Sequence, residues 1–530
     1  MKKINIFNII IVALAGSLLT SCSKKAMDDV NMDRNHTQDV PARFILTDAM
    51  TATAFNVVGG DVSLYASIYL EHEGGVWNQA YQSENRITQP TSATTYNNSW
   101  DAVYNNIKAL KIAVSKTAQG GSEEGNDVTG GIAKVLLAYN LGVLTDLYGD
   151  VPYQQTGIMN EDGTPKYMQP AIDKQSDLYT EIQKLLDEAI TQLAGSDASL
   201  IGGIVANKNQ DLLYGAKANL WTKAAYGLKA RYLMHTLKVS ADVNGDLNKI
   251  LNYVSKSFAD ASEEMKFDLY DGSSNINPLY GISSSRDMLG ASKSLATKFK
   301  NTNDPRGNQV FVTYGGKLLT NDAAITNGVP NGEAEQVQFT YPIAILDYAS
   351  TAPTLLLSYH EVLFLKAEAL ARLNRGAEAS EPLHEAIVAA FANLEQSIES
   401  GNSGLMDALG TSKTIVTPDL SESVANDYFT TSVLPRFAQN ALKEVVLQKY
   451  LAFFGASGES TEAYNDYRRL KALGQEDFIG LANPLNAQAK FPLRYTYGNS
   501  DVTANQAIKA AFGDGSYVYK ENVWWAGGSR

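Results

Sequence analysis

Hydrophobic residues recur every three to four positions over most of the chain, which is the spacing of one face of an α-helix. Residues 132–147, 178–193 and 442–453 show this pattern most clearly. Just before the second of these segments, Ser176 stands where a helix N-cap is expected. Residues 355–373 are apolar on nearly every side, which predicts a buried helix. The pattern therefore predicts a mainly α fold, built as a single large helical domain.

Two departures from simple periodicity add detail to this prediction. Strand-like runs are few, and we expect only short strands at 310–314 and 337–341. Polar and glycine-rich patches predict surface loops, which would form a loop-rich ligand face; they lie at 118–131, 195–211, 271–288 and 320–335.

One predicted helix pair carries a repeat signature. Small and apolar residues fall at the offsets of a tetratricopeptide unit, where small side chains let two helices approach closely; these residues are Ala367, Leu370, Ala379, Leu383 and Ala386. An ordinary helical hairpin would fit the same residues equally well. The sequence leaves both interpretations open.

The N-terminus has the features of an export signal. Lys2 and Lys3 precede an apolar stretch at 9–19, which is too short to span a bilayer and has the length of a signal-peptide core. The stretch ends in Leu-Thr-Ser-Cys, with Cys22 as the cysteine, and this resembles a bacterial lipobox. An ordinary secretory signal with a stray cysteine nearby is the alternative.

Cys22 is the only cysteine, so an internal disulfide is excluded and lipidation accounts for the residue. We therefore predict a signal peptide at 1–21, a lipidated flexible tether at 22–41 and a helical body at 42–530. No stretch beyond the N-terminus is expected to cross a membrane. The net charge of −13 disfavours nucleic acid as a partner.

A search for catalytic or metal-binding patterns gives no match. Each His-Glu pair lacks the second histidine that a zinc protease needs four positions later. Residues 242–248 alternate oxygen-bearing side chains as a calcium loop does, but they lack its glycine and its final glutamate, so we interpret them as a polar turn. The sequence thus predicts no catalytic residue, no metal and no cofactor.

Several motifs together resemble the SusD/RagB family of nutrient-binding outer-membrane lipoproteins. The most specific is Asp-Leu-Tyr-Gly-Asp-Val-Pro-Tyr at 146–153, which is similar to the family signature D-x-Y-G-D-V-P-Y. Further matches extend the resemblance over nearly the whole mature chain; they are Trp100 to Ile107, Asp304-Pro305-Arg306, Tyr359 to Ala369, Gln448-Lys449-Tyr450, Asp466 to Arg469, and Arg494 to Asn505.

The resemblance implies packed helices with tetratricopeptide-like hairpins and a binding protein rather than an enzyme. It also implies a SusC-like TonB-dependent transporter as partner and an outer-membrane location facing the cell exterior. The shared motifs are expected to be structural, with Asp150 and Arg468 satisfying buried polar groups. Ligand residues of the family lie in variable loops, so no motif transfers them.

Aromatic residues in polar surroundings are the best ligand-binding candidates, because an aromatic face suits a sugar ring or a peptide. The chain has 28 tyrosines and 5 tryptophans. We predict contacts in two loops, although a core role is an equal alternative: Trp77, Asn78, Gln79, Tyr81 and Arg86 in the first, and Asn275, Asn277, Tyr280, Arg286 and Asp287 in the second. The neighbouring pair Trp100 and Tyr104 is expected in the core.

The expected function is therefore capture of an oligosaccharide, or alternatively of a peptide, for uptake through the partner transporter. Two functions of other classes stay open at this point. One is a surface hydrolase, and the other is a scaffold that holds proteins with its helical repeats.

Overall fold

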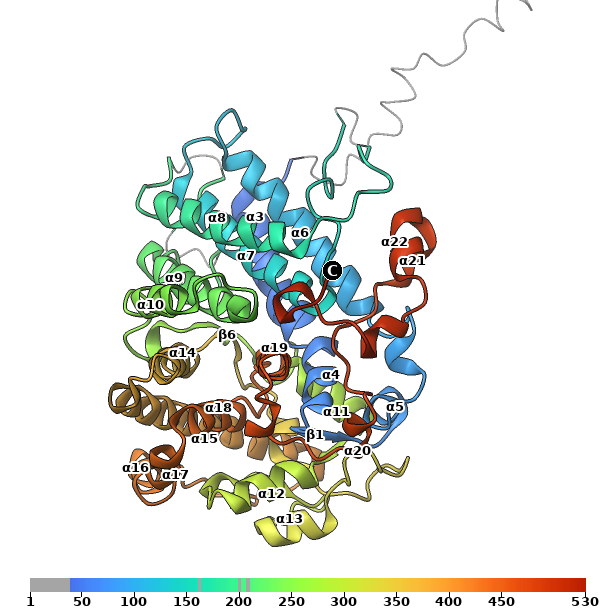
Figure 1. Cartoon of the computed structure of the whole chain (residues 1–530), viewed down its shortest axis with the longest axis vertical. Helices are drawn as coiled ribbons and strands as arrows, with labels where there is room; N and C mark the ends of the chain where they lie inside the picture. The colour runs from blue at the N-terminus through green and yellow to red at the C-terminus, as the bar shows by residue number, and fades with distance from the viewer. Residues whose placement is uncertain (1–38, 161–163, 199–201, 206–209) are drawn as a thin grey trace, which may run out of the picture. The chain divides into compact units, whose positions relative to one another are not determined.

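Successive helices pack side by side and build most of the fold, as Figure 1 shows. The computed structural model describes residues 39–160, 164–198, 202–205 and 210–530, and Ala42–Arg530 form one unit. The predicted signal peptide at 1–21, the lipidation site Cys22 and nearly all of the tether at 22–41 lie outside the described residues.

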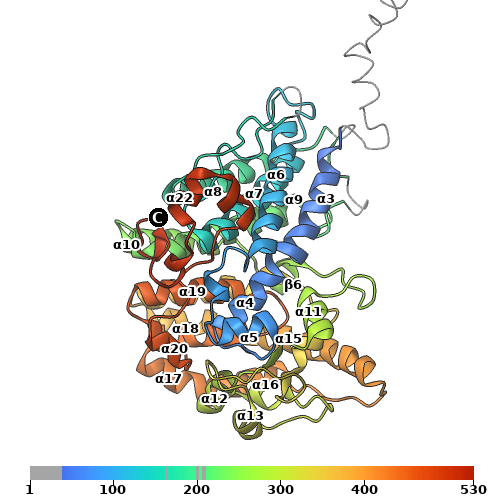
Figure 2. The same ribbon diagram turned by 90° about the vertical axis from the view of Figure 1, so that its right-hand side faces the viewer.

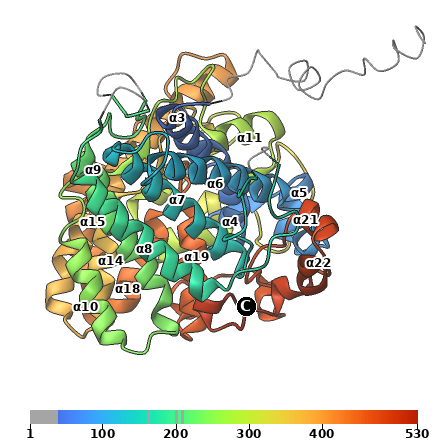
Figure 3. The same cartoon turned by 90° about the horizontal axis from the view of Figure 1, so that it is seen from above.

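Eight helices form a continuous array, in which each helix contacts the next one along the chain. They are α3 (Ala42–Ala52), α6 (Asn97–Thr117), α7 (Asp127–Tyr148), α8 (Gln175–Leu193), α9 (Ala218–His235), α10 (Val243–Val254), α14 (Tyr359–Arg372) and α15 (Gly376–Leu409). Figure 3 shows α3, α6 and α7 lying together at one end of the array. The mainly α prediction is confirmed.

The remaining helices surround this array. They are α4 (Asp61–Tyr69), α5 (Asn78–Glu84), α11 (Pro278–Arg286), α12 (Lys293–Asn301), α13 (Asn321–Asn327), α16 (Glu422–Tyr428), α17 (Leu434–Gln439), α18 (Ala441–Ala452), α19 (Ser460–Ala472), α20 (Pro484–Ala487), α21 (Asn499–Ala504) and α22 (Gln506–Phe512). Short turns of other helix types join them. Figure 2 shows α4, α5 and α11 on the face that is turned toward the viewer.

Within the described ranges, six short strands form three antiparallel pairs. They are β1 (Glu73–Gly75) with β3 (Leu289–Ala291), β2 (Met265–Phe267) with β6 (Thr354–Leu357), and β4 (Phe311–Val312) with β5 (Ile343–Ala344). The strand predicted at 310–314 is therefore present as β4. The prediction of a strand at 337–341 is wrong, because that segment is an irregular loop.

The three clearest periodic segments correspond to α7, α8 and α18. The cap predicted for α8 is wrong, since Lys174 and not Ser176 occupies the N-cap position and offers no side-chain cap. Asp150 takes that role from a distant loop. Its Oδ1 accepts a hydrogen bond from the N–H of Gln175 at 2.8 Å, and its Oδ2 pairs with Lys174 Nζ at 2.9 Å. A negative charge at a helix N-terminus is favourable.

The apolar segment 355–373 is not a single helix. Its first residues belong to β6, and Ser358 then caps α14 by accepting a hydrogen bond from the N–H of Glu361 at 3.1 Å. A fully buried strand and a buried helix share the same apolar composition, so periodicity could not separate them. The predicted loops are corrected in the same way, because α7, α11 and α13 begin within them.

Helices α14 and α15 form the hairpin that the repeat signature predicted. All five signature residues are at most 4% exposed, and three of them are alanines at the helix interface. Small side chains at these positions bring the two helices close together. The tetratricopeptide-like interpretation is confirmed as part of the helical fold.

Helix α7 forms the centre of the fold. Contrary to the expectation from sequence, it is long and apolar enough to span a bilayer, but 89% of its apolar window is buried in the protein. Gly142 on α7 faces α9, where an added Cβ would lie 2.2 Å from the hydroxyl of Tyr232. The glycine therefore sets how closely the two helices approach.

Candidate functional site

The β1–β3 pair brings the two predicted ligand loops together. Gly74 lies opposite Gly290 and Gly75 opposite Leu289, so the segment after β1 and the segment before β3 leave from the same end of the ribbon. The N–H of Val76 extends the ladder by donating to the carbonyl of Met288 at 2.9 Å. Two loops about 200 residues apart in sequence thus form one surface.

Trp77 anchors this surface to the core. Its ring packs with Ile282 of α11 against a small hydrophobic cluster that includes Leu279 and Met288. The side chain remains half-buried, so part of the ring is accessible. Residues from both loops therefore hold Trp77 in place.

A third segment, which sequence reasoning did not connect with ligand, joins the other two. The N–H of Val337 donates to the carbonyl of Val76 at 3.1 Å, and Gln338 Nε2 donates to the carbonyl of Arg286 at 2.8 Å. Phe339 lies between these hydrogen-bonded residues and Tyr341. It is 62% exposed, and its ring meets the ring of Tyr314 edge-on, with 5.3 Å between the ring centroids.

We call the three segments 76–81, 280–287 and 337–341 the ribbon-end surface. Phe339 carries the same signal that singled out Trp77, an aromatic residue among amides and hydroxyls. The alternation of polar and apolar residues around Phe339 predicted a strand at 337–341 instead, so Phe339 was not predicted to contact ligand.

Three non-glycine residues of the ribbon-end surface have positive φ, as have several others elsewhere in the described chain. Asn78 (φ 48°), Asp287 (φ 44°) and Phe339 (φ 59°) all adopt left-handed conformations. Asn and Asp tolerate this region, whereas a bulky aromatic residue rarely adopts it. Such conformations persist where the surrounding structure imposes them, and they cluster at binding sites.

Most predicted contact residues are accessible on or beside this surface. Asn78, Asn275 and Arg286 are exposed, and five others are half-buried: Trp77, Gln79, Tyr81, Tyr280 and Asp287. The ring of Tyr280 meets that of Tyr348 at 6.3 Å. Burial raises the pKa of Asp287.

Two predicted contacts, Arg86 and Asn277, need correction because their side chains are 5% and 1% exposed. Arg86 donates to the carbonyl of Glu84 at 3.2 Å and lies 4.9 Å over the ring of Tyr69. Asn277 caps α11, while its Nδ2 donates to the carbonyls of Ala352 and Ala456. Both side chains hold loops in position rather than face solvent.

A buried acid pair lies behind the ribbon-end surface. Glu73 on β1 and Asp347, next to Tyr348, are 3% and 2% exposed. Glu73 Oε2 has no hydrogen-bond partner among the described residues, and Asp347 has at most the backbone of Ala344 as a partner. Burial raises the pKa of Asp347 to about 7; burial and the charge of Asp347 raise the pKa of Glu73 well above its usual range.

The signature motifs have structural roles, as predicted. Trp100, at 1% exposure, lies in the core and donates from Nε1 to Asp501 Oδ2 at 2.7 Å. Arg468 donates to the carbonyl of Leu493 at 3.0 Å. These two contacts join the C-terminal segment to α6 and α19, while the Asp150 cap joins the loop after α7 to α8.

The segment that resembles a calcium loop has a different role. Residues 243–254 form α10, and Asp242 caps it by accepting a hydrogen bond from the N–H of Gly245 at 2.9 Å. The predicted polar turn is therefore a helix start. Within the ranges that the structure describes, no group of three or more His, Cys, Asp and Glu side chains is placed to hold a metal ion.

Comparison with known proteins identifies relatives along nearly the whole chain. The family described as SusD-like, starch-binding and associating with the outer membrane, matches residues 33–498. A SusD/RagB family protein from Bacteroides thetaiotaomicron is 46% identical and superposes with a TM-score of 0.86, covering 93% of this chain and 100% of its own. No curated protein matches the chain.

More distant structures share the fold. A SusD homologue from Bacteroides fragilis is 20% identical with a TM-score of 0.66, covering 93% of this chain and 100% of its own. A chitin-binding SusD homologue from Flavobacterium johnsoniae is 19% identical with a TM-score of 0.62, covering 91% of this chain and 98% of its own.

Proposed function

Because this chain belongs to the SusD-like family, we propose that it binds oligosaccharide nutrients and delivers them to a SusC-like TonB-dependent transporter of the outer membrane. The family consists of binding proteins rather than enzymes. The observation that carries the proposal is the ribbon-end surface, where three distant segments present aromatic and polar side chains together.

The proposed recognition combines stacking with hydrogen bonds. Trp77 and Phe339 offer apolar ring faces to the C–H faces of sugars, with Tyr81 and Tyr280 nearby. Sugar hydroxyls would bond to the side chains that remain accessible around these rings, which are Asn78, Gln79, Asn275, Arg286 and Asp287. The contacts that fix Trp77 in the absence of ligand reduce the ordering that binding requires.

The membrane part of the proposal rests on the N-terminal sequence. We propose that residues 1–21 are removed, that Cys22 carries the lipid, and that residues 22–41 tether the domain at 42–530 to the outer membrane, facing outward. Palmitate labelling of cells producing wild type or Cys22→Ala tests the anchor. Copurification of a β-barrel transporter with the full-length protein from native membranes tests the partner.

Trp77→Ala is expected to weaken oligosaccharide binding about ten- to fiftyfold, because it removes the anchored stacking face. Retention on arrays of starch- and chitin-derived oligosaccharides, followed by calorimetry, measures the loss. Peptide arrays run in parallel decide between the two ligand classes. Retention of peptides alone would reject the saccharide proposal.

Two further variants separate binding from folding. Phe339→Ala removes an exposed ring from the same surface without touching the core, and we expect a smaller loss of about three- to tenfold. Phe44→Ala is the matched control, because Phe44 is an aromatic residue on α3 with 48% exposure and lies outside the ribbon-end surface. If all three variants bind as wild type does, the surface is not the ligand site.

A further inference from the structure

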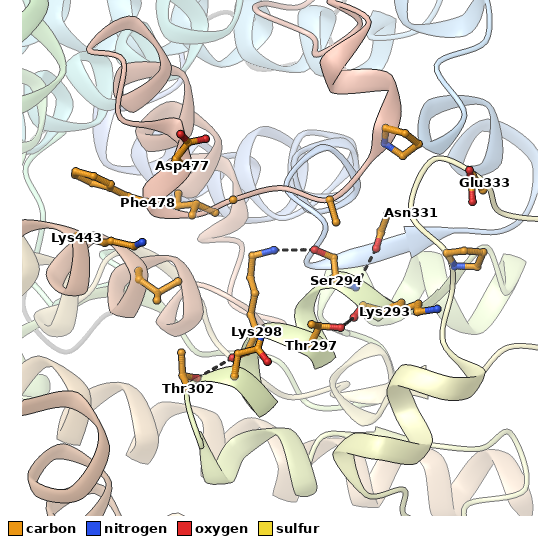
Figure 4. A pocket seen from close by; sticks show the side chains of 17 residues that line it. Lys293, Ser294, Thr297, Lys298, Thr302, Asn331, Glu333, Lys443, Asp477 and Phe478 are labelled. Atoms are coloured by element: carbon orange, nitrogen blue, oxygen red, sulfur yellow. Dashed lines mark hydrogen bonds between the residues drawn. The ribbon is translucent and has the colours of Figure 1, made fainter. Parts of the chain in front are cut away.

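A second cavity lies apart from the ribbon-end surface. It has a volume of about 650 Å³, opens to solvent, and is lined by α12, the first half of α18, the segment 330–333 and the segment from Asp477 to Pro484 (Figure 4). Ligand pockets commonly measure about 300–1,000 Å³. None of the residues proposed to contact ligand at the ribbon-end surface lines it. We call it the lysine cavity.

The lining of the lysine cavity is positive, although the whole chain carries a net charge of −13. Lys293, Lys298 and Lys443 face two acids, Glu333 and Asp477. Figure 4 shows Lys298 reaching into the middle of the cavity, with Lys443 on one side and Lys293 on the other. Low-dielectric walls strengthen the field of such a group of charges.

Lys298 is the central feature, because its ammonium group is nearly buried and has one hydrogen-bond acceptor among the described residues. Its side chain is 11% exposed, and Nζ donates one hydrogen bond, to Ser294 Oγ at 2.7 Å. An ammonium group has three donors. The carboxylate of Glu71 lies 3.9 Å away, which is too far for a hydrogen bond.

Glu71 is also committed elsewhere. Its two oxygens accept hydrogen bonds from the N–H groups of Ala482 and Asn483, both at 2.7 Å. The negative charge of Glu71 is thus shared between two amides and the more distant Lys298. Consistent with this arrangement, burial lowers the pKa of Lys298 against the opposing effect of Glu71.

A second donor in the lining is also unused. Asn331 is 8% exposed, and its Oδ1 accepts from Ser292 Oγ and from the N–H of Ser294. Those bonds fix the orientation of the amide. Its Nδ2 has no partner among the described residues. A buried donor without an acceptor costs about 1–3 kcal/mol, and such a group in a native protein calls for an explanation.

The two outer lysines are free to meet a ligand. Lys293 and Lys443 are exposed and form no ion pair within the part of the chain that the structure describes. Lys300, two residues beyond Lys298 on α12, differs from them because it pairs with Asp322. Lys293 and Lys443 therefore line the cavity without an ion pair to any described residue, whereas Lys300 is paired and does not line it.

We propose that the lysine cavity is a binding site for a carboxylated sugar, with the carboxylate bound by Lys298 and flanked by Lys293 and Lys443. An incoming carboxylate supplies acceptors to the ammonium of Lys298, which uses one of its three donors on Ser294. Phe478 and Leu447 offer apolar surface to the ring, and Thr297 offers a hydroxyl. The sugar part of this inference rests on the proposed function, but the carboxylate part does not.

Calorimetric titration of the full mature protein with glucuronate, glucose and acetate tests the inference. We expect glucuronate to bind at least tenfold more tightly than glucose, and more tightly than acetate, with affinity falling as salt is added. Equal binding of glucose and glucuronate would overturn the proposal. Equal binding of acetate and glucuronate would reduce the site to a simple carboxylate site and reject the sugar.

Lys298→Met keeps the shape of the side chain and removes its charge, so we expect at least a tenfold loss of glucuronate affinity. Lys443→Gln, at an exposed position that leaves the core intact, is expected to lose about threefold and covers the case in which Lys298→Met fails to fold. Lys300→Gln is the control and should bind as wild type does. Unchanged affinity in both Lys298→Met and Lys443→Gln would refute the site.

The two proposals fail separately. Trp77→Ala should leave glucuronate binding intact, and Lys298→Met should leave binding of neutral oligosaccharides intact. Loss of glucuronate binding in Trp77→Ala would show that acidic sugars bind at the ribbon-end surface instead.

Discussion

Replacing Glu368 by glutamine is expected to lower the free energy of unfolding by about 3–5 kcal/mol, because it breaks a buried network of charges. Glu368, at the end of α14, binds Arg469 of α19 through both oxygens, at 2.6 and 2.8 Å. Arg372 donates to the same carboxylate at 2.7 Å. All three side chains are at most 10% exposed.

The network extends through the motif residues of α18 and α19. Asp466 accepts from Arg469 at 2.8 Å and pairs with Lys449 at 2.7 Å. Burial by itself would raise the pKa of Glu368, but Arg469 and Arg372 outweigh it and hold that pKa well below its ordinary value. Glutamine removes the charge that balances Arg372 and Arg469, and Asp466 is then the remaining carboxylate beside Arg469 and Lys449.

Two further variants identify the cause of the loss. The double variant Glu368→Gln, Arg469→Met restores the net charge of the network, so we expect it to be more stable than Glu368→Gln alone. Glu378→Gln is the control. It removes an exposed carboxylate of α15 that pairs with Arg375, and it should not change the unfolding curve. Urea unfolding at pH 7 measures all of them. A double variant less stable than the single one would contradict this account.

The buried acid pair is expected to make the protein less stable as pH rises. Its carboxyl groups have folded-state pKa values above their ordinary values, so the folded protein binds more protons than the unfolded chain. For Asp347, this stability is fully present below about pH 4 and is lost as pH rises through about 7. The loss for this residue alone amounts to about 4 kcal/mol at most.

Asp347→Asn is therefore expected to flatten the decline of stability between about pH 4 and 8. Equilibrium unfolding at several pH values gives the difference between variant and wild type. His235 also titrates in the folded protein, because Glu462 and Asp146 outweigh its burial and raise its pKa to about 9. Its contribution is the same in variant and wild type, so it cancels in the difference. Asp322→Asn, at an exposed carboxylate, is the control and should run parallel to wild type. A parallel curve for Asp347→Asn would show that this carboxyl does not titrate as argued.

Local pattern was sufficient for elements that are long and bury one face. The stripes of α7, α8 and α18 and the alanines of the α14–α15 hairpin were readable from sequence, because helical packing imposes a fixed spacing on them. The boundary between β6 and α14 could not be read from sequence, since both elements bury apolar residues on all sides. The cap of α8 was also missed, because the capping carboxylate of Asp150 comes from a separate loop.

The candidate site shows the same division. Sequence pointed to Trp77 and to the loop around Tyr280 by their aromatic and polar composition, but as two separate surfaces. Pairing of β1 with β3 joins them, and hydrogen bonds add Phe339. Burial excludes Arg86 and Asn277 as accessible contacts, since their side chains are 5% and 1% exposed and lie among groups of the protein interior.

By itself, the sequence determined the helical class, the hairpin repeat and the family, because these depend on spacing and on motifs that are continuous along the chain. Only the tertiary structure decided which loops meet, which polar groups are buried, and which buried donors are left with unused hydrogen-bonding capacity. Residues such as Lys298 and Asn331 acquire their character from groups far away in sequence, and no local pattern records those contacts.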